Sequence, residues 1–152
     1  MKTPLLLQIL AVLLLIAVVP SAWAESRKVN FSIADAMKRI DLAEELEEKS
    51  LSLYWADQVP PRNIEKEFEP DTYSRGVNAF LKSDVRACTN SFEMVFERLL
   101  KDAESFGANA IIGIRSYHDE LPDLSSETEY RCDVGKFRAS VGFRVRFVKL
   151  PK

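Results

Sequence analysis

The stretch Val85–Tyr117, which reads VRACTNSFEMVFERLLKDAESFGANAIIGIRSY, decides the fold of this chain. Its first two thirds place apolar side chains three or four positions apart, the spacing of one face of an α-helix. The residues on this face are Val85, Cys88, Phe92, Val95, Phe96, Leu99, Leu100, Ala103 and Phe106. Ser83 and Asp84 offer an N-cap, and Gly107 fits the left-handed position that ends a helix. A face this wide predicts that the helix packs against a sheet.

A short apolar run, Ala110–Ile114, follows that helix. Such a run is typical of a strand that is buried on both faces of a sheet. Gly113 within it indicates the close approach of another backbone or side chain. The polar segment His118–Ser126 comes next, and we expect it to form a loop.

The chain before the central helix predicts one more helix and several strands. Ser32 is a suitable N-cap, and apolar residues at helical spacing predict a helix over residues 33–48. Residues that favour strands predict one strand at Leu51–Trp55 and two weaker ones at Ile64–Phe68 and Tyr73–Phe80.

The C-terminal part predicts a hairpin of Thr128–Val134 and a long strand from Phe137 to Leu150. Apolar and polar residues alternate along the long strand, which indicates one buried and one exposed face. The exposed face carries a basic row, Arg138, Arg144 and Arg146. We expect this row to be solvated and paired with acidic side chains on neighbouring strands. The fold class is therefore α+β, a single domain with an antiparallel-rich sheet and two helices packed on one face.

The start of the chain has the three parts of a secretory signal peptide. A positive residue, Lys2, precedes the apolar run Leu5–Val19, and residues 22–24 have the small-x-small pattern of a cleavage site. The alternative is a membrane anchor, but the run is shorter than the roughly 20 residues that a spanning helix needs. We predict a signal peptide at residues 1–24, a single domain at residues 25–152 and export to the periplasm. No cysteine lies near the cleavage site to carry a lipid anchor.

Charge and cysteine content restrict the function classes. The net charge of −2 becomes −3 when the signal peptide takes Lys2 away, so no basic footprint for nucleic acid is present. The chain has two cysteines, Cys88 and Cys132, and an even count in an exported protein indicates one disulfide. The alternative is a pair of free thiols or metal ligands.

No group of residues forms a recognisable catalytic set. Four neighbouring side chains are of metal-binding types: His118, Asp119, Glu120 and Asp123. Nothing in their pattern supplies the surrounding groups that hold metal ligands in place. Ser125 and Ser126 share this segment, but the G-x-S-x-G turn of a hydrolase nucleophile is missing. The sequence therefore predicts no enzyme, no cofactor and no resident metal.

The phrase Gly107–Arg115, GANAIIGIR, resembles the hallmark of the YbjQ-like superfamily, in which a helix runs into a G-A-N-A-(V/I) strand. The same turn beside a cysteine-bridged strand is similar to the RcsF envelope sensor. Other segments resemble small exported bacterial proteins that are often labelled "excinuclease ATPase subunit", and this similarity covers roughly Leu51–Leu150. Those segments are Asn78–Phe80, Lys82–Asp84, Ala87–Cys88, Ser125–Glu129 and Cys132.

The resemblance implies an α+β domain and a bridge between Cys88 and Cys132. It implies no excinuclease activity, because the chain lacks the phosphate-binding loops and zinc cysteines of such an ATPase. RcsF-like domains have further cysteines and a lipid anchor, which this chain lacks, so a membrane-tethered sensor is not implied. The likeness to YbjQ-like domains implies a ring-shaped homo-oligomer and heavy-metal binding.

We therefore expect a non-enzymatic periplasmic protein that binds an envelope protein, with no membrane span after cleavage. The alternative is a small-ligand or metal-binding module of the YbjQ-like type. The expected ligand or partner surface lies on the side of the sheet that follows the central helix, and consists of Asn109, His118, Ser126, Glu127 and Glu129.

Overall fold

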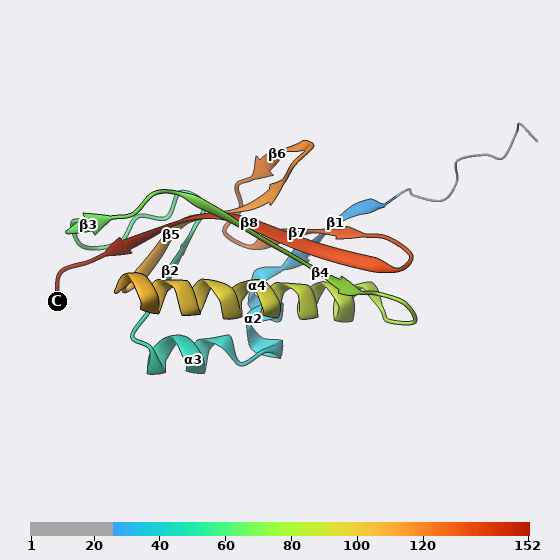
Figure 1. The fold of residues 1–152 in the computed structure, drawn as a ribbon, viewed down its shortest axis with the longest axis horizontal. Coiled ribbons are helices and arrows are strands. Elements are labelled where there is room, and N and C mark those ends of the chain that lie inside the picture. The colour runs from blue at the N-terminus through green and yellow to red at the C-terminus, as the bar shows by residue number, and fades with distance from the viewer. Residues whose placement is uncertain (1–25) are drawn as a thin grey trace, which may run out of the picture.

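The computed structural model describes residues 26–152 (Figure 1), so the predicted signal peptide lies outside the described residues. The α+β class predicted from the sequence is confirmed. In chain order the elements are β1 (Arg27–Ser32), α2 (Ile33–Arg39), α3 (Leu42–Glu48), β2 (Ser52–Trp55), β3 (Lys66–Glu67), β4 (Asp71–Asn78), α4 (Asp84–Phe106), β5 (Ala110–His118), β6 (Leu121–Leu124), β7 (Glu129–Val134) and β8 (Arg138–Lys149).

Strand β8 is the centre of an eight-stranded sheet. One edge of β8 pairs with β4 and then β3, and the other edge pairs with β7 and then β5. Strand β1 extends the sheet beyond β7, and β6 folds back on β5. All of these pairs are antiparallel, whereas β2 runs parallel to β5.

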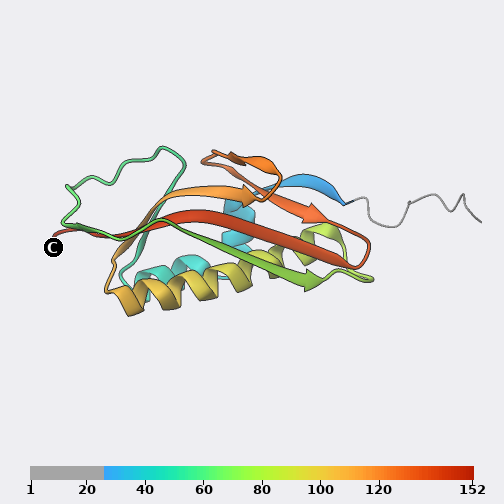
Figure 2. The same ribbon diagram turned by 45° about the horizontal axis from the view of Figure 1, so that its top comes forward.

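The helices cover one face of this sheet. Figures 1 and 2 show α4 lying along the sheet with α2 and α3 on the same side, while the β5–β6 hairpin rises from the opposite side. The inward side chains of β8 are all buried: Ala139, Val141, Phe143, Val145 and Phe147. They meet an aromatic cluster formed by Trp55, Phe92, Phe96 and Tyr130. Fully burying one such side chain contributes about 1.5–3 kcal/mol, so this layer contributes strongly to the stability of the domain.

The central helix follows the sequence prediction closely. Ser83 is its N-cap, because its hydroxyl accepts a hydrogen bond from the backbone N–H of Arg86 at 3.3 Å. Gly107 ends it with φ of 68°, the left-handed conformation that favours glycine. Cys88 near its start is bonded to Cys132 of β7, and both residues are fully buried. The disulfide is thereby confirmed, and the alternative of free thiols or metal ligands is wrong.

The helix predicted over residues 33–48 is two helices. The break lies at Asp41, which has a positive φ of 51°. Ile33 and Leu42 are nine positions apart, so one straight helix would place them on opposite faces at 100° per residue. Both are nearly fully buried, at 4% and 1% exposed. The break turns both side chains into the same core.

Two predictions for the chain around β5 are wrong. Residues 118–126 are not one loop, because β5 continues to His118 and Leu121–Leu124 forms the strand β6. Strand β6 lies at the edge of the sheet, where Pro122 is tolerated although it has no backbone N–H to donate. Gly113 does not mark close approach, since a Cβ there would meet nothing within 4 Å. Instead Gly113 has φ of 61° and lies at a bulge where the β5–β8 register shifts.

Close approach occurs at another glycine, on β8. A Cβ on Gly142 would lie 2.9 Å from the carbonyl oxygen of Tyr117. The missing side chain lets the β5–β6 hairpin cross over β8 on the face away from the helices.

Candidate functional site

Asn109, the first residue of the predicted ligand surface, has a structural role. Its amide donates a hydrogen bond to the carbonyl of Leu150 at 3.0 Å, and its side-chain oxygen accepts one from the Leu150 N–H at 2.7 Å. The side chain therefore acts as an extra strand residue that ties the start of β5 to the end of β8. This explains the asparagine of the G-A-N-A turn by backbone pairing.

His118 lies at the far end of β5 from Asn109. Its Nδ1 accepts a hydrogen bond from the backbone N–H of Glu120 at 3.1 Å, which fixes the turn of the β5–β6 hairpin. Nδ1 is thus an acceptor, so in the neutral ring Nε2 carries the proton. Nε2 faces Asp133 of β7, with 3.4 Å between Nε2 and Oδ2.

The remaining predicted residues lie around the entry to β7. The hydroxyl of Ser126 accepts hydrogen bonds from the backbone N–H groups of Thr128 and Glu129, at 3.3 and 3.0 Å. Glu127 accepts a hydrogen bond from the side chain of Gln58 at 3.4 Å, and Glu129 is exposed at the first position of β7. The structure therefore does not bring the five predicted residues together in one site.

The metal-capable side chains of the β5–β6 hairpin point to different partners. Tyr117 donates a hydrogen bond to Asp119, and this bond raises the pKa of the phenol. Asp123 pairs with Arg144 at 2.7 Å, and His118 faces Asp133. Among residues 26–152 no group of three or more His, Cys, Asp or Glu side chains is placed to hold a metal ion.

The basic row of β8 is paired as predicted at two of its three positions. Arg144 bonds Asp123 of β6, and Arg146 bonds Glu67 of β3 at 2.6 Å. The guanidinium of Arg144 also stacks over the Tyr117 ring at 4.9 Å. These contacts hold the hairpin and β3 against β8.

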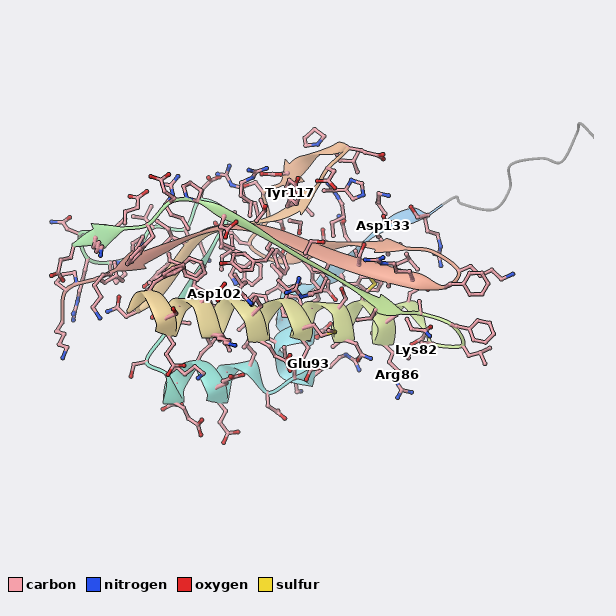
Figure 3. All side chains as sticks on the ribbon, in the orientation of Figure 1. Lys82, Arg86, Glu93, Asp102, Tyr117 and Asp133 are labelled. Carbon is pink, nitrogen blue, oxygen red and sulfur yellow. A yellow bond between two sulfur atoms is a disulfide. The ribbon has the colours of Figure 1, made fainter. Side chains whose placement is uncertain are left out.

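A polar groove of about 330 Å³ lies under that hairpin, on the sheet face opposite the helices. Figure 3 shows Tyr117 and Asp133 on this side. Small residues form its floor: Ser74, Ser140 and Gly142. Charged side chains form its walls: His118, Asp119, Arg131, Asp133 and Arg138.

Asp133 is the carboxylate in this groove that contacts both Lys28 and His118. Its Oδ2 lies 3.0 Å from the ammonium of Lys28 and 3.4 Å from the His118 ring, while Oδ1 is buried without a hydrogen-bond partner among the described residues. Burial alone would raise the pKa of this carboxyl. Contacts with Ser26, Lys28 and His118 outweigh burial, so the pKa lies below its ordinary value.

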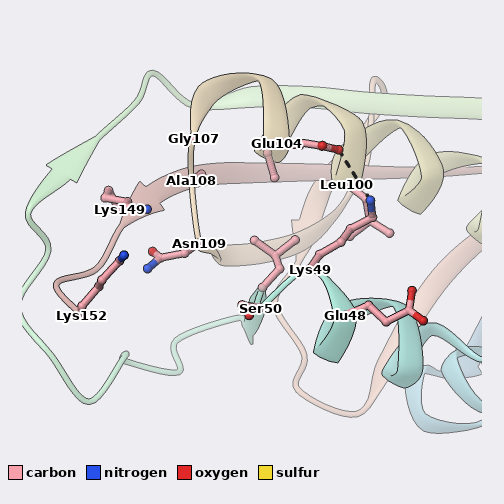
Figure 4. A pocket seen from close by; sticks show the side chains of 12 residues that line it. Glu48, Lys49, Ser50, Leu100, Glu104, Gly107, Ala108, Asn109, Lys149 and Lys152 are labelled. Atoms are coloured by element: carbon pink, nitrogen blue, oxygen red, sulfur yellow. Dashed lines mark ion pairs between the residues drawn. The ribbon is translucent and has the colours of Figure 1, made fainter.

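A second hollow, of about 530 Å³, opens at the C-terminal end of α4 (Figure 4). Its rim carries Lys49, Lys149 and Lys152, together with Glu48 and Glu104. Lys49 pairs with Glu104 at 3.6 Å, and both side chains are substantially exposed. Charges of both signs at an open, solvated rim give this hollow little selectivity.

The most unusual surface lies at the other end of the molecule, where the β4–α4 and β7–β8 turns meet. Phe80, Leu81 and Phe137 are 51%, 90% and 57% exposed there, and we call these three residues the apolar tip. The rings of Phe80 and Phe137 stack with centroids 5.7 Å apart, and the N–H of Ala79 donates to the Phe137 carbonyl at 2.9 Å. Because the two turns brace each other, the apolar side chains are displayed on a fixed scaffold.

Leu81 has a backbone conformation that suits glycine. Its φ is 58°, and the N–H of Lys82 donates to the carbonyl of Ala79, so Leu81 occupies the third position of a tight turn. The left-handed region costs an ordinary L-residue roughly 1–2 kcal/mol. A strained leucine whose side chain makes almost no packing contribution points to a role outside the fold.

Basic residues surround the apolar tip. Residues 78–86 and 134–137 contain Lys82, Arg86 and Lys136 against one acid, Asp84, which gives a local charge of +2 in a chain whose total is −2. Figure 3 places Lys82 and Arg86 at this end. The ammonium of Lys136 lies over the Phe137 ring, 5.3 Å from its centroid. The tip is therefore both apolar and positive.

The sequence alone does not reveal this surface. The alternation of the last strand continues through Phe137 and predicts a buried side chain there, but Phe137 lies before β8 begins and is exposed. Leu81 lies in a turn, where sequence periodicity carries no information. The available signal was the Phe80–Lys82 segment itself, two large apolar residues and a lysine directly before a helix cap.

No family model and no curated protein matches the sequence, and no solved structure matches the fold. The YbjQ-like and RcsF-like resemblance therefore stays a prediction. Between residues 26 and 152 no helix is long and apolar enough to cross a membrane.

Proposed function

We propose that this chain is an exported, non-enzymatic protein of the bacterial envelope, and that it acts by binding a partner through the apolar tip. The exposure of Phe80, Leu81 and Phe137 on two mutually braced turns is the observation that carries this proposal. Large apolar side chains that are exposed side by side are typical of interaction surfaces.

Two further features support a binding role outside the cytosol. The buried disulfide fits an oxidising compartment, as does the signal-like sequence of residues 1–24. The polar residues that the sequence offered for catalysis or metal binding instead bond one another or the backbone, and they stabilise the β5–β6 hairpin.

Photo-crosslinking in intact cells tests the proposal. A benzoylphenylalanine at Phe137 is expected to form adducts with an envelope component, and the adducts should disappear when Leu81 is changed to Ser. The matched control is the same probe at Val59, which is 82% exposed in the loop between β2 and β3. Equal labelling at both positions, or none at Phe137, counts against a partner at the tip.

A second candidate function is binding of a small polar ligand or metal in the groove under the hairpin. The buried Oδ1 of Asp133 favours it, because this oxygen has no hydrogen-bond partner among residues 26–152 and would gain from a donor or a cation. Calorimetry with divalent metals should then give heat with the native protein and less with His118→Ala. Identical titrations of the two proteins would remove the metal form of this candidate.

A further inference from the structure

We infer that the partner of the apolar tip is the surface of an anionic lipid bilayer. This inference rests on the proposed function, and it names the chemistry of the partner at that same site. Three side chains would enter the interfacial region, Phe80, Leu81 and Phe137, and three basic residues lie close to them in the chain: Lys82, Arg86 and Lys136.

The side-chain chemistry of the tip suits an interface between water and hydrocarbon. Aromatic rings and leucine enter the boundary between headgroups and acyl chains, while lysines and arginines remain at the level of the phosphates. Juxtaposed basic residues attract anionic headgroups, and this attraction falls off within a Debye length. The excess of two positive charges that these two turns carry in an acidic chain complements an anionic surface.

The N-terminal start of the domain lies at the same end of the molecule as the apolar tip. Arg27 begins β1, pairs with Val134 beside the β7–β8 turn, and bonds Asp84 at the start of α4 at 2.6 Å. The described chain therefore starts beside the apolar tip. The apolar run Leu5–Val19 precedes it, and the connecting residues 20–26 reach at most about 25 Å. A bilayer that holds this run during export therefore lies within reach of the tip.

A substitution at Leu81 separates the effect on folding from the effect on lipid binding. A glycine at this position relieves the left-handed conformation of Leu81, whose φ is 58°, and removes an apolar side chain that is 90% exposed. Leu81→Gly should therefore fold at least as well as the native protein and still bind lipid more weakly. A residue that merely stabilised the turn would show the opposite pattern.

Vesicle co-sedimentation of the oxidised mature protein tests this inference. The probe vesicles contain phosphatidylethanolamine with phosphatidylglycerol as one part in four, and the comparison vesicles contain phosphatidylcholine alone. We expect binding to the anionic vesicles only, a loss of about tenfold or more for Phe80→Ser/Phe137→Ser, and a similar loss for Lys82→Glu/Lys136→Glu. Leu81→Gly should also weaken binding, whereas Val59→Ser should bind as the native protein does. Urea midpoints of all variants report whether they fold.

The outcomes separate this inference from the proposed function. No binding to either vesicle, equal binding to both, or binding that the tip variants leave unchanged overturns the lipid inference. If the crosslink at Phe137 then goes to a protein, the proposed function stands with a protein partner. If the crosslink is also missing, both fail.

Discussion

Removal of the disulfide should be the most destabilising covalent change in this domain. The bond joins Cys88 and Cys132 across 44 residues, and the chain-entropy model gives about 4 kcal/mol for a loop of that length at 25 °C. Domains of this size unfold with free energies of about 5–15 kcal/mol, so reduction should remove a large share of the total. On heating, this corresponds to a fall in Tm on the order of 15 °C.

Urea unfolding of oxidised and reduced protein measures this loss. Trp55 is the one tryptophan within residues 25–152, and its ring lies 5.6–6.4 Å from those of Phe92, Phe96 and Phe143, so its fluorescence reports the core. Reduction keeps both sulfur atoms in place and so isolates the effect of the cross-link.

A matched control uses the Cys88→Ala/Cys132→Ala protein, whose midpoint should not respond to reductant. A reduced native protein that loses less than about 1 kcal/mol would refute the reasoning. It would also weaken the argument for an oxidising compartment, because the domain would then not need its bridge.

Four further outcomes follow from the structure. Asn109→Ala should lower the free energy of unfolding by about 2 kcal/mol in urea titrations, because both backbone groups of Leu150 lose their partner, and it should leave lipid binding unchanged. Leu81→Gly should raise the urea midpoint slightly or leave it unchanged, since relief of roughly 1–2 kcal/mol of backbone strain offsets the added chain entropy. The pKa of Asp133 is lowered in the folded protein, so the carboxylate stabilises the fold above its ordinary pKa of 3.8, and this contribution is lost as the pH falls through the folded pKa. Asp133→Asn should therefore show a shallower acid-unfolding transition than the native protein when tryptophan fluorescence is followed. Gly142→Ala should cost about 1–3 kcal/mol, because its Cβ would meet a carbonyl oxygen at 2.9 Å, and unchanged thermal stability would show that the hairpin can move aside.

The parts of the fold that the sequence predicted are those with strong periodicity. Helix α4 and strand β8 have long apolar patterns, and both ends of α4 carry cap residues, Ser83 and Gly107, whose conformations leave few alternatives. The disulfide followed from cysteine count and inferred export. These features depend on local chemistry, which a single sequence displays.

The errors arose where tertiary contacts decide the local structure. Strand β6 contains Pro122 and Asp123, and it exists because the end of β5 offers an edge and Arg131 bonds the Pro122 carbonyl at 2.9 Å. The break at Asp41 exists because Ile33 and Leu42 face the same core. Neither reason is visible in a window of a few residues.

The candidate site was less predictable than the fold. The sequence pointed to polar residues after the central strand, and most of these prove to hold turns and strand ends in place, as Asn109 and Ser126 do. The apolar tip joins two turns that are more than fifty residues apart in sequence, so only the folded chain shows that Leu81 and Phe137 share one surface.

Hydrogen–deuterium exchange of the oxidised protein, with and without envelope membranes, tests the central claim most directly. Binding through the apolar tip predicts slower exchange in residues 78–82 and 135–138, with no change in the hairpin of residues 117–124 or in the loop that contains Val59. Protection confined to residues 117–124 would move the functional surface to the groove around Asp133. Unchanged exchange in both turns would contradict the claim that the tip binds an envelope partner.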